Sequence, residues 1–204
     1  MRIAPPFGGS STGWMGNPEG LVESRRSLPG GIRNQVWNDS RTAYHHARGE
    51  LAGDRRGVAS VEVQGLAYDA LRESAALLRS SPGDRQETLR FAGECEARAA
   101  WLRAAVERVF WVDGARGRYV ALGTDRDGAG RLRPLCVRTS NMGHLLTSRM
   151  LDGADGAERA DVIAAALGQA DLLAAAGIRT LSSDAVRYRS ADTTSGRCGR
   201  GRTS

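Results

Sequence analysis

Residues 33–40 form the densest group of side chains in this sequence that could do chemistry. A tryptophan, Trp37, stands two positions before a carboxylate, Asp39, with the guanidinium of Arg33 and the amide of Gln35 nearby in the chain. A sugar site uses this combination, because a ring face stacks on apolar C–H surface while polar groups bind hydroxyls. The alternative is a capped loop, in which Asp39 or Ser40 is the N-cap of a helix.

Two further groups of polar residues stand where helices are expected to begin. Glu62 and Gln64 open the first strongly periodic segment, where a carboxylate either binds a ligand or simply complements the helix dipole. His144 lies in a turn that leads into a short helix. A lone histidine at such a place is either functional or a satisfied structural residue.

No arrangement of residues predicts a metal or a cofactor. His45 and His46 have no third ligand nearby, so zinc binding is not expected there. The segment 125–128 begins like a calcium loop but has no downstream glutamate, which indicates a plain turn. The three cysteines are scattered and odd in number, which favours a reducing cytoplasm: Cys95, Cys136 and Cys198.

The elements that must position these residues are mainly helical. Apolar residues recur with the helical period over 63–78, 91–110 and 162–174, and a short helix is expected over 142–151. Short apolar runs at 119–122 and 132–137 flank Asp127-Gly128, which predicts a β-hairpin around that turn. The pattern indicates long antiparallel helices joined by polar loops, with the chemistry in the loops.

The charge of the chain raises a competing class of function. The formal net charge is +6 and the pI is near 10.0, which suggests a nucleic-acid binder with a basic tail. However, half of this excess lies in residues 188–204, and every basic side chain is arginine. We therefore expect no nucleic-acid partner, and the absence of an apolar run of about 18 residues predicts no membrane partner.

Four blocks of sequence, taken in order, resemble one family. They are residues 20–40, with Trp37-Asn38-Asp39-Ser40; residues 61–68, with Val61-Glu62-Val63-Gln64-Gly65; residues 140–146; and residues 177–182. Together they resemble the catalytic domain of six-hairpin glycosidases, in the glycogen-debranching, amylo-alpha-1,6-glucosidase-like group related to mannosyl- and glucosylglycerate hydrolases. The resemblance covers roughly residues 16–187.

The resemblance implies a fold, a reaction and a site. The fold would be mainly α, a partial (α/α)6 toroid with a small β-hairpin insertion. The reaction would be inverting hydrolysis of α-glucosidic bonds by two carboxylates about 6.5–9.5 Å apart. Asp39 maps to the general acid, and the expected partner is a glucan or a small glycoside. The residues that map to substrate-binding positions are Arg33, Gln35, Trp37, Glu62, Gln64, His144 and Arg179.

The sequence departs from the family in three places. Met142 stands where the family usually has proline. Residues 1–15 are expected to form an irregular arm unlike the family's upstream helices. Residues 188–204 are expected to be an Arg/Gly-rich tail produced by a shift of reading frame, because one back-translation of this tail encodes the family's next motif in another frame.

These departures lead to an expectation about activity. The family's segment that carries the catalytic base is missing, so the 204-residue chain is expected to be inactive, poorly stable and prone to aggregation. Other functions left open are a non-catalytic carbohydrate-binding remnant and a basic-tailed RNA-binding protein. The sequence assigns neither a linkage specificity nor an oligomeric state.

Overall fold

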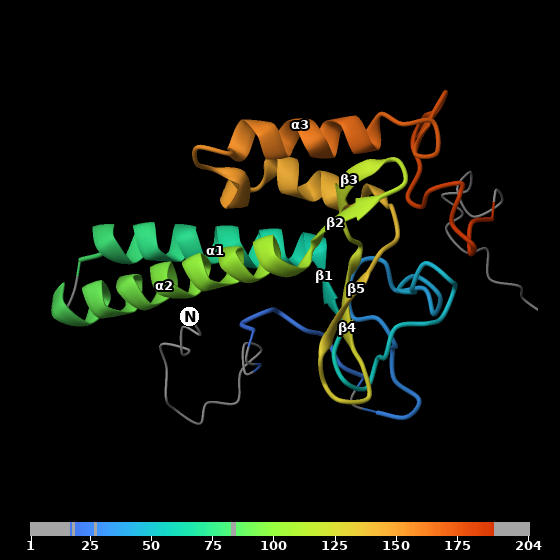
Figure 1. Cartoon of the computed structure of the whole chain (residues 1–204). Helices are drawn as coiled ribbons and strands as arrows, with labels where there is room; N and C mark the ends of the chain where they lie inside the picture. Colours follow the sequence, from blue (N-terminus) through green and yellow to red (C-terminus); the bar gives the residue numbers. More distant parts are fainter. Residues whose placement is uncertain (1–16, 18, 27, 83–84, 190–204) are drawn as a thin grey trace, which may run out of the picture.

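The computed structural model, shown in Figure 1, describes residues 17, 19–26, 28–82 and 85–189. The predicted arm at 1–15 lies outside the described residues. So does the part of the predicted tail from 190 to 204.

Two long helices form an antiparallel hairpin. Helix α1 is Val61–Ser80 and helix α2 is Arg85–Val109, and they lie side by side in Figure 1. Pro82 follows α1 closely, and a proline disfavours the helical conformation of the residue before it. The helices predicted over 63–78 and 91–110 are confirmed. Each buries a stripe of residues of helical period: Ala67, Leu71 and Ala75 on α1, and Ala92, Ala99, Leu102, Ala105 and Val106 on α2.

Three small antiparallel sheets accompany the helices. The first has the order β1-β4-β5, formed by Ala59–Ser60, Gly123–Arg126 and Leu132–Leu135. The second is the hairpin β2-β3, formed by Trp111–Gly114 and Gly117–Val120 directly after α2. The third pairs β6 with β7, Leu173–Ala174 with Gly177–Ile178.

The hairpin predicted around Asp127-Gly128 forms with a different partner strand. The turn is present, because the amide of Gly130 donates to the carbonyl of Asp127 at 3.0 Å. The strand opposite β5 is β4, however, whereas residues 117–120 pair with β2. β4 also pairs with β1, and at Gly123 a Cβ would lie 2.5 Å from the backbone oxygen of Ala59. Only glycine lets β4 lie this close to β1.

A second layer covers the helix hairpin. Two 3-10 helices, η1 (Ser140–Thr147) and η2 (Arg149–Leu151), pack between α1 and α3 (Gly156–Leu167). The predicted helix over 142–151 is therefore a pair of 3-10 helices. The predicted helix over 162–174 ends at Leu167, and residues 173–174 are in a strand instead. The main core lies between the layers and includes Met142, Leu145, Met150, Ile163 and Ala166.

The residues that precede α1 form an irregular lobe, the segment 19–58. It has a small core of its own, made with the first sheet: Tyr44, Ala52, Val58, Leu122, Leu135 and Val137. The guanidinium of Arg126 on β4 fixes the start of this lobe, because it bonds to Glu23 at 2.8 Å and to Glu19 at 2.6 Å. The lobe has little regular secondary structure, and polar contacts of this kind attach it to the first sheet.

The expected fold class is wrong. Helices account for 40% of the structure and strands for 17%, and the strands form three separate small sheets. The described residues contain one hairpin of long helices and one further α-helix, not a ring of helical hairpins. The physical reason is that residues 19–58 and 111–135 lack the 3.6-residue apolar period. Glycines and short apolar runs there favour turns and strands instead.

Candidate functional site

An exposed aromatic pair joins two of the sequence blocks. The ring centroids of Trp37 and His144 lie 6.3 Å apart with the ring planes tilted by 54°. Trp37 is 56% exposed, and His144 and Asp39 are also exposed. Residues 107 positions apart therefore meet at the surface. Asp39, two positions after Trp37, has no hydrogen bond or ion pair among the described residues. We call Trp37, Asp39 and His144 the aromatic surface.

A buried carboxylate lies at the start of α1. Glu62 is 1% exposed, and its Oε1 accepts a hydrogen bond of 3.0 Å from the hydroxyl of Tyr44. Burial raises the pKa of Tyr44, and the charge of Glu62 raises it further, so the phenol keeps its proton and donates. The N-terminal end of a helix favours a negative charge. The hydroxyl of Tyr44 thus links Glu62 to the lobe, and the N-terminal end of α1 favours its negative charge.

Several buried polar atoms nearby have no partner among the described residues. These include Glu62 Oε2, Thr139 Oγ1 and both side-chain amide atoms of Asn141, which is fully buried on η1. Since η1 packs against α1, these groups belong to neighbouring elements. A buried polar group without a hydrogen bond costs about 1–3 kcal/mol.

Gln64, an expected substrate-binding residue, is held at the start of α1 by hydrogen bonds to the backbone. It is fully buried, and its Oε1 accepts from the amide of Val22 at 2.8 Å. Its Nε2 donates to the carbonyls of Val22 at 3.0 Å and Ser60 at 2.9 Å. All these partners are backbone groups, so Gln64 fastens the start of the lobe to α1.

Three other predicted substrate-binding residues also bond to the backbone. Arg33 donates to the carbonyl of Ala52 at 2.6 Å. Gln35 donates to the carbonyl of Arg25 at 3.2 Å. Arg179 donates at 3.1 and 3.3 Å to the carbonyls that end the loop after α3, those of Ala170 and Leu173. Gln35 is exposed, whereas Arg33 and Arg179 are partly buried.

Contacts link the four sequence blocks to one another, although the residues within them make different kinds of contact. Residues 140–146 and 177–182 are joined by a hydrogen bond of 3.3 Å from the amide of Ser140 to the carbonyl of Thr180. Tyr44, just after the first block, joins it to Glu62 in the second. The aromatic pair joins the first block to the third. No hydrogen bond or ion pair links Asp39 to Glu62 within the described part of the chain.

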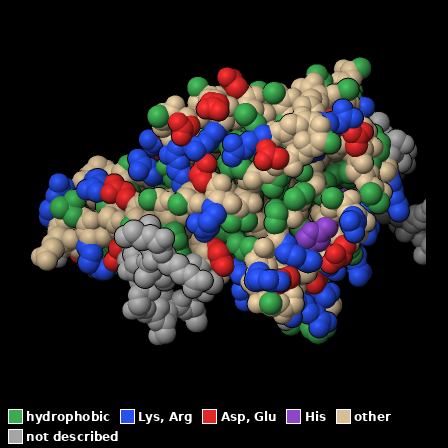
Figure 2. All heavy atoms as spheres, in the orientation of Figure 1, with side chains coloured by type: hydrophobic (Ala, Val, Ile, Leu, Met, Phe, Trp, Pro, Cys, Tyr) green, Lys and Arg blue, Asp and Glu red, His purple; other side chains and the backbone are tan. Residues whose placement is uncertain are grey.

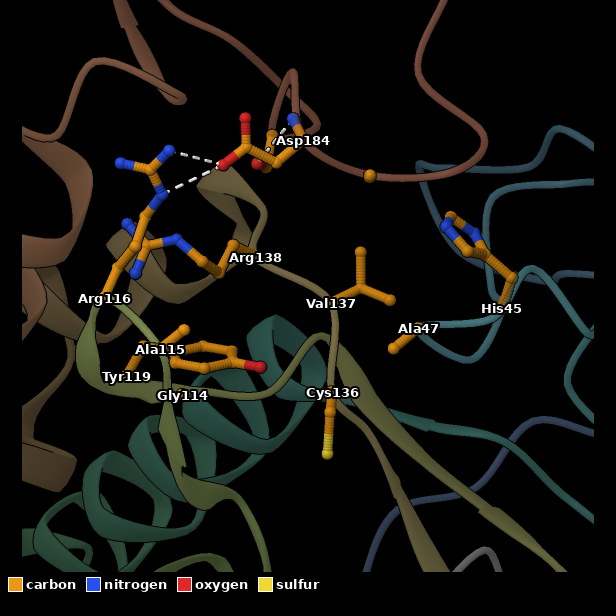
Figure 3. A pocket seen from close by; sticks show the side chains of 12 residues that line it. His45, Ala47, Gly114, Ala115, Arg116, Tyr119, Cys136, Val137, Arg138 and Asp184 are labelled. Atoms are coloured by element: carbon orange, nitrogen blue, oxygen red, sulfur yellow. Dashed lines mark hydrogen bonds and ion pairs between the residues drawn. The ribbon is translucent and has the colours of Figure 1, made fainter.

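A pocket that none of the predicted residues lines opens beside the β2–β3 hairpin (Figure 3). Its volume is about 220 Å3, and its walls come from four separate segments. We call it the hairpin pocket. Its lining includes His45, Ala47, Arg116, Tyr119, Cys136 and Arg138. Sequence reasoning missed it, because these residues share no motif and His45 was considered only as a metal ligand.

One wall of the hairpin pocket rests on a buried ion pair. The carboxylate of Asp171, whose side chain is fully buried, accepts from Arg138 Nε at 3.0 Å and from the hydroxyl of Ser182 at 2.6 Å. Burial alone would raise the pKa of Asp171, but the bonds from Ser182 and Arg138 outweigh it and lower the pKa.

This lowered pKa predicts a loss of stability in acid. The pKa of an aspartate in an unfolded chain is about 3.9, so the stabilising contribution of Asp171 is fully present above that pH. It should be lost as the pH falls through the lower pKa of the folded state. Urea unfolding midpoints at pH 7, 4 and 3 should therefore decrease, with a shallower decrease in Asp171→Asn. Parallel pH profiles for the two proteins would contradict the assignment.

Comparison with known proteins gives no relative. No family model, no curated protein and no solved structure matches the chain. Among the described helices, none has the length and apolar character that crossing a bilayer requires. Within the same residues, no three His, Cys, Asp or Glu side chains gather as metal ligands would.

Proposed function

We propose that this chain is the sugar-binding part of an inverting glycoside hydrolase that acts on α-glucosidic bonds, of the amylo-alpha-1,6-glucosidase type. The observation that carries the proposal is the aromatic surface. Trp37 offers an exposed ring face, and the ring centroid of His144 lies 6.3 Å from its own. Asp39, two residues further along the chain, is exposed. An exposed tryptophan with polar neighbours is suited to stack on a sugar ring.

In this proposal Asp39 is the general acid that protonates the leaving oxygen. Its exposure fits that role, because the acid must reach the bond between two sugar units. Glu62 is buried against Tyr44, so it holds the site together or binds a hydroxyl and does not activate water. No residue of this chain is assigned as the base. We therefore predict that the chain alone does not hydrolyse glycosides.

Charge distribution supports a carbohydrate partner over a nucleic acid. In Figure 2, basic and acidic side chains alternate across the visible face. Among the described residues, many arginines are paired with acids, as in the pairs Arg79–Glu96 and Arg116–Asp184. Nucleic-acid binding instead needs a continuous basic surface. We also propose a cytoplasmic location, because Cys95 and Cys136 are free thiols.

Binding of isomaltose to the 204-residue chain tests this function. Isothermal titration calorimetry should detect binding, and Trp37→Ala should weaken it at least about tenfold, which is about 1.4 kcal/mol. Leu77→Ala is the matched control, since Leu77 is 71% exposed on α1 and belongs to no part of the aromatic surface. Equal affinities in the Trp37 variant and the parent would refute the role of this ring. Binding of isomaltose without cleavage, even when azide is supplied in place of the activated water, would favour a non-catalytic carbohydrate-binding protein.

A further inference from the structure

A second pocket lies between two turns that are far apart in the sequence. The amide of Gly49 donates to the carbonyl of His46 at 2.8 Å and closes the first turn, and the amide of Tyr188 donates to the carbonyl of Ala185 at 2.8 Å and closes the second. Both turns lie away from the tip of the α1–α2 hairpin (Figure 1). The pocket has a volume of about 380 Å3, and we call it the basic pocket. Its lining includes Thr42, Arg48, Gly49, Arg187, Tyr188 and Arg189.

Direct contacts fix the two turns against each other. Arg187 Nε donates to the carbonyl of Gly49 at 2.7 Å, across 138 positions of the chain. Gly49 has a φ of +86°, a conformation that favours glycine, and a Cβ there would lie 3.3 Å from Cγ1 of Val186. Because Gly49 directly follows Arg48, these contacts also fix the backbone that carries Arg48.

The positive charge of the basic pocket is not neutralised within the described part of the chain. Three of its lining residues are arginines and none is acidic. None of these three arginines forms an ion pair with a described residue. The acids beside the two turns bond elsewhere, since Glu50 lies 3.6 Å from Arg133 and Asp184 lies 2.7 Å from Arg116. An excess of positive charge therefore remains in these walls.

The guanidinium groups also keep donors for a ligand. Arg187 uses Nε for Gly49, and its two Nη groups have no hydrogen bond to any described residue. Arg48 and Arg189 are exposed and Arg187 is half-buried, so a ligand from solvent can reach all three side chains. Thr42 adds a hydroxyl to the same pocket. A planar guanidinium with unused N–H groups binds phosphate or carboxylate by parallel hydrogen bonds.

Charge and size favour a phosphate group over a carboxylate. A phosphate monoester carries about −1.5 to −2 charges at pH 7 and offers three strong acceptor oxygens. A carboxylate carries one charge and offers two oxygens. We propose that the basic pocket binds a phosphate group, free or in a small ester, through the guanidinium groups of Arg48 and Arg187. The volume of about 380 Å3 falls within the roughly 300–1,000 Å3 of small-molecule pockets, which leaves room for the body of an ester.

The basic pocket is separate from the aromatic surface, because neither Trp37 nor His144 lines it. The proposal therefore does not depend on the glycosidase assignment. Nucleic acid is the alternative source of phosphate, but it needs a continuous basic surface. Arg133 and Arg116, which bond to the acids beside the two turns, are already paired. A small phosphate compound is therefore favoured.

Titration of the full chain with glycerol 3-phosphate tests this site, because this ester has no sugar ring that could stack on Trp37. Isothermal titration calorimetry in a buffer without phosphate should give a Kd below about 1 mM. Arg48→Ala should weaken binding at least about tenfold, since it removes hydrogen bonds to a charged group. Arg108→Ala is the matched control, because it removes the same charge at an exposed position on α2 and should bind like the parent. Circular dichroism of each variant verifies that the helices are intact.

Further ligands decide what carries the phosphate. Inorganic phosphate should displace glycerol 3-phosphate, and glycerol alone should not bind. A tighter ester than inorganic phosphate would identify an ester as the ligand, and equal affinities would identify free phosphate. Trp37→Ala should bind glycerol 3-phosphate like the parent, so a failure of isomaltose binding leaves this result intact.

Two results would overturn the proposal. One is absence of binding by the parent, or equal affinities of the parent and Arg48→Ala for glycerol 3-phosphate. The other is binding of a single-stranded oligouridylate that Arg48→Ala weakens, while glycerol 3-phosphate does not bind. That result would assign these arginines to a nucleic-acid contact instead.

Discussion

The variant Asp39→Asn is expected to lose about 10²–10⁴-fold of the rate at which the chain cleaves isomaltose with the assistance of azide. Azide can replace the activated water of an inverting enzyme that has no base. It attacks the anomeric carbon from the face opposite the leaving group, and the bond to the leaving oxygen breaks. Asp39 donates its proton to that oxygen, and the products are β-glucosyl azide and glucose. An asparagine cannot donate this proton.

Proton NMR of the products measures this prediction, because the anomeric signal identifies the β-azide. Asp161→Asn is the matched control, since Asp161 is an exposed aspartate on α3 outside the proposed site. It should leave the rate unchanged. Formation of β-glucosyl azide at the parent rate by Asp39→Asn would move the acid to another residue. Absence of the azide product with the parent chain would contradict the presence of a functional acid.

Replacing Asp125 by alanine is expected to destabilise the fold by about 3 kcal/mol, the lower end of the cost of breaking a buried ion pair. The side chain of Asp125 on β4 is fully buried. It accepts from Arg133 at 2.8 and 3.0 Å, from the amide of Gly53 at 2.9 Å, and it lies 3.1 Å from His46 Nε2. These bonds attach the lobe to the first sheet, so their loss leaves several donors unpaired. Because Arg133 is 36% exposed, solvent screens part of the cost.

Urea unfolding at pH 7 measures this effect. The control is Asp113→Ala, an exposed aspartate on β2 whose replacement should hardly move the midpoint. If the two variants unfold at the same urea concentration, Asp125 does not fasten the lobe. A loss of the lobe alone would show as a separate first transition, with the signal of α1 and α2 retained.

The long helices could be predicted from the sequence because their signals are local. The stripes that include Leu71 on α1 and Leu102 on α2 repeat with the helical period, and Pro82 marks the end of α1. The strands could not be predicted with the correct pairing. Gly123 lies next to Ala59, 64 positions earlier, and nothing in the local pattern reveals that contact. The toroid was an extrapolation from the resemblance and is contradicted by the strands.

Residue types in the candidate site were easier to predict than their roles. Trp37 and His144 do meet, as members of blocks that the resemblance groups together. Gln64 and Arg33 also stand in these blocks, yet their side chains donate to the backbone carbonyls of Val22 and Ala52. A sequence shows which side chain can hydrogen-bond but not which partner it finds. The hairpin pocket escaped prediction for the same reason, because its walls come from four segments without a shared motif.

The most direct measurement of the central claim is a titration of the 15N-labelled chain with isomaltose, followed through the indole N–H signals. The chain has four tryptophans, and Trp37→Phe assigns the signal of Trp37. The account predicts a saturable shift of the Trp37 signal, with little change at Trp111, which is partly buried at the start of β2. A Trp37 signal that stays unmoved at saturating isomaltose would contradict glycoside binding at the aromatic surface.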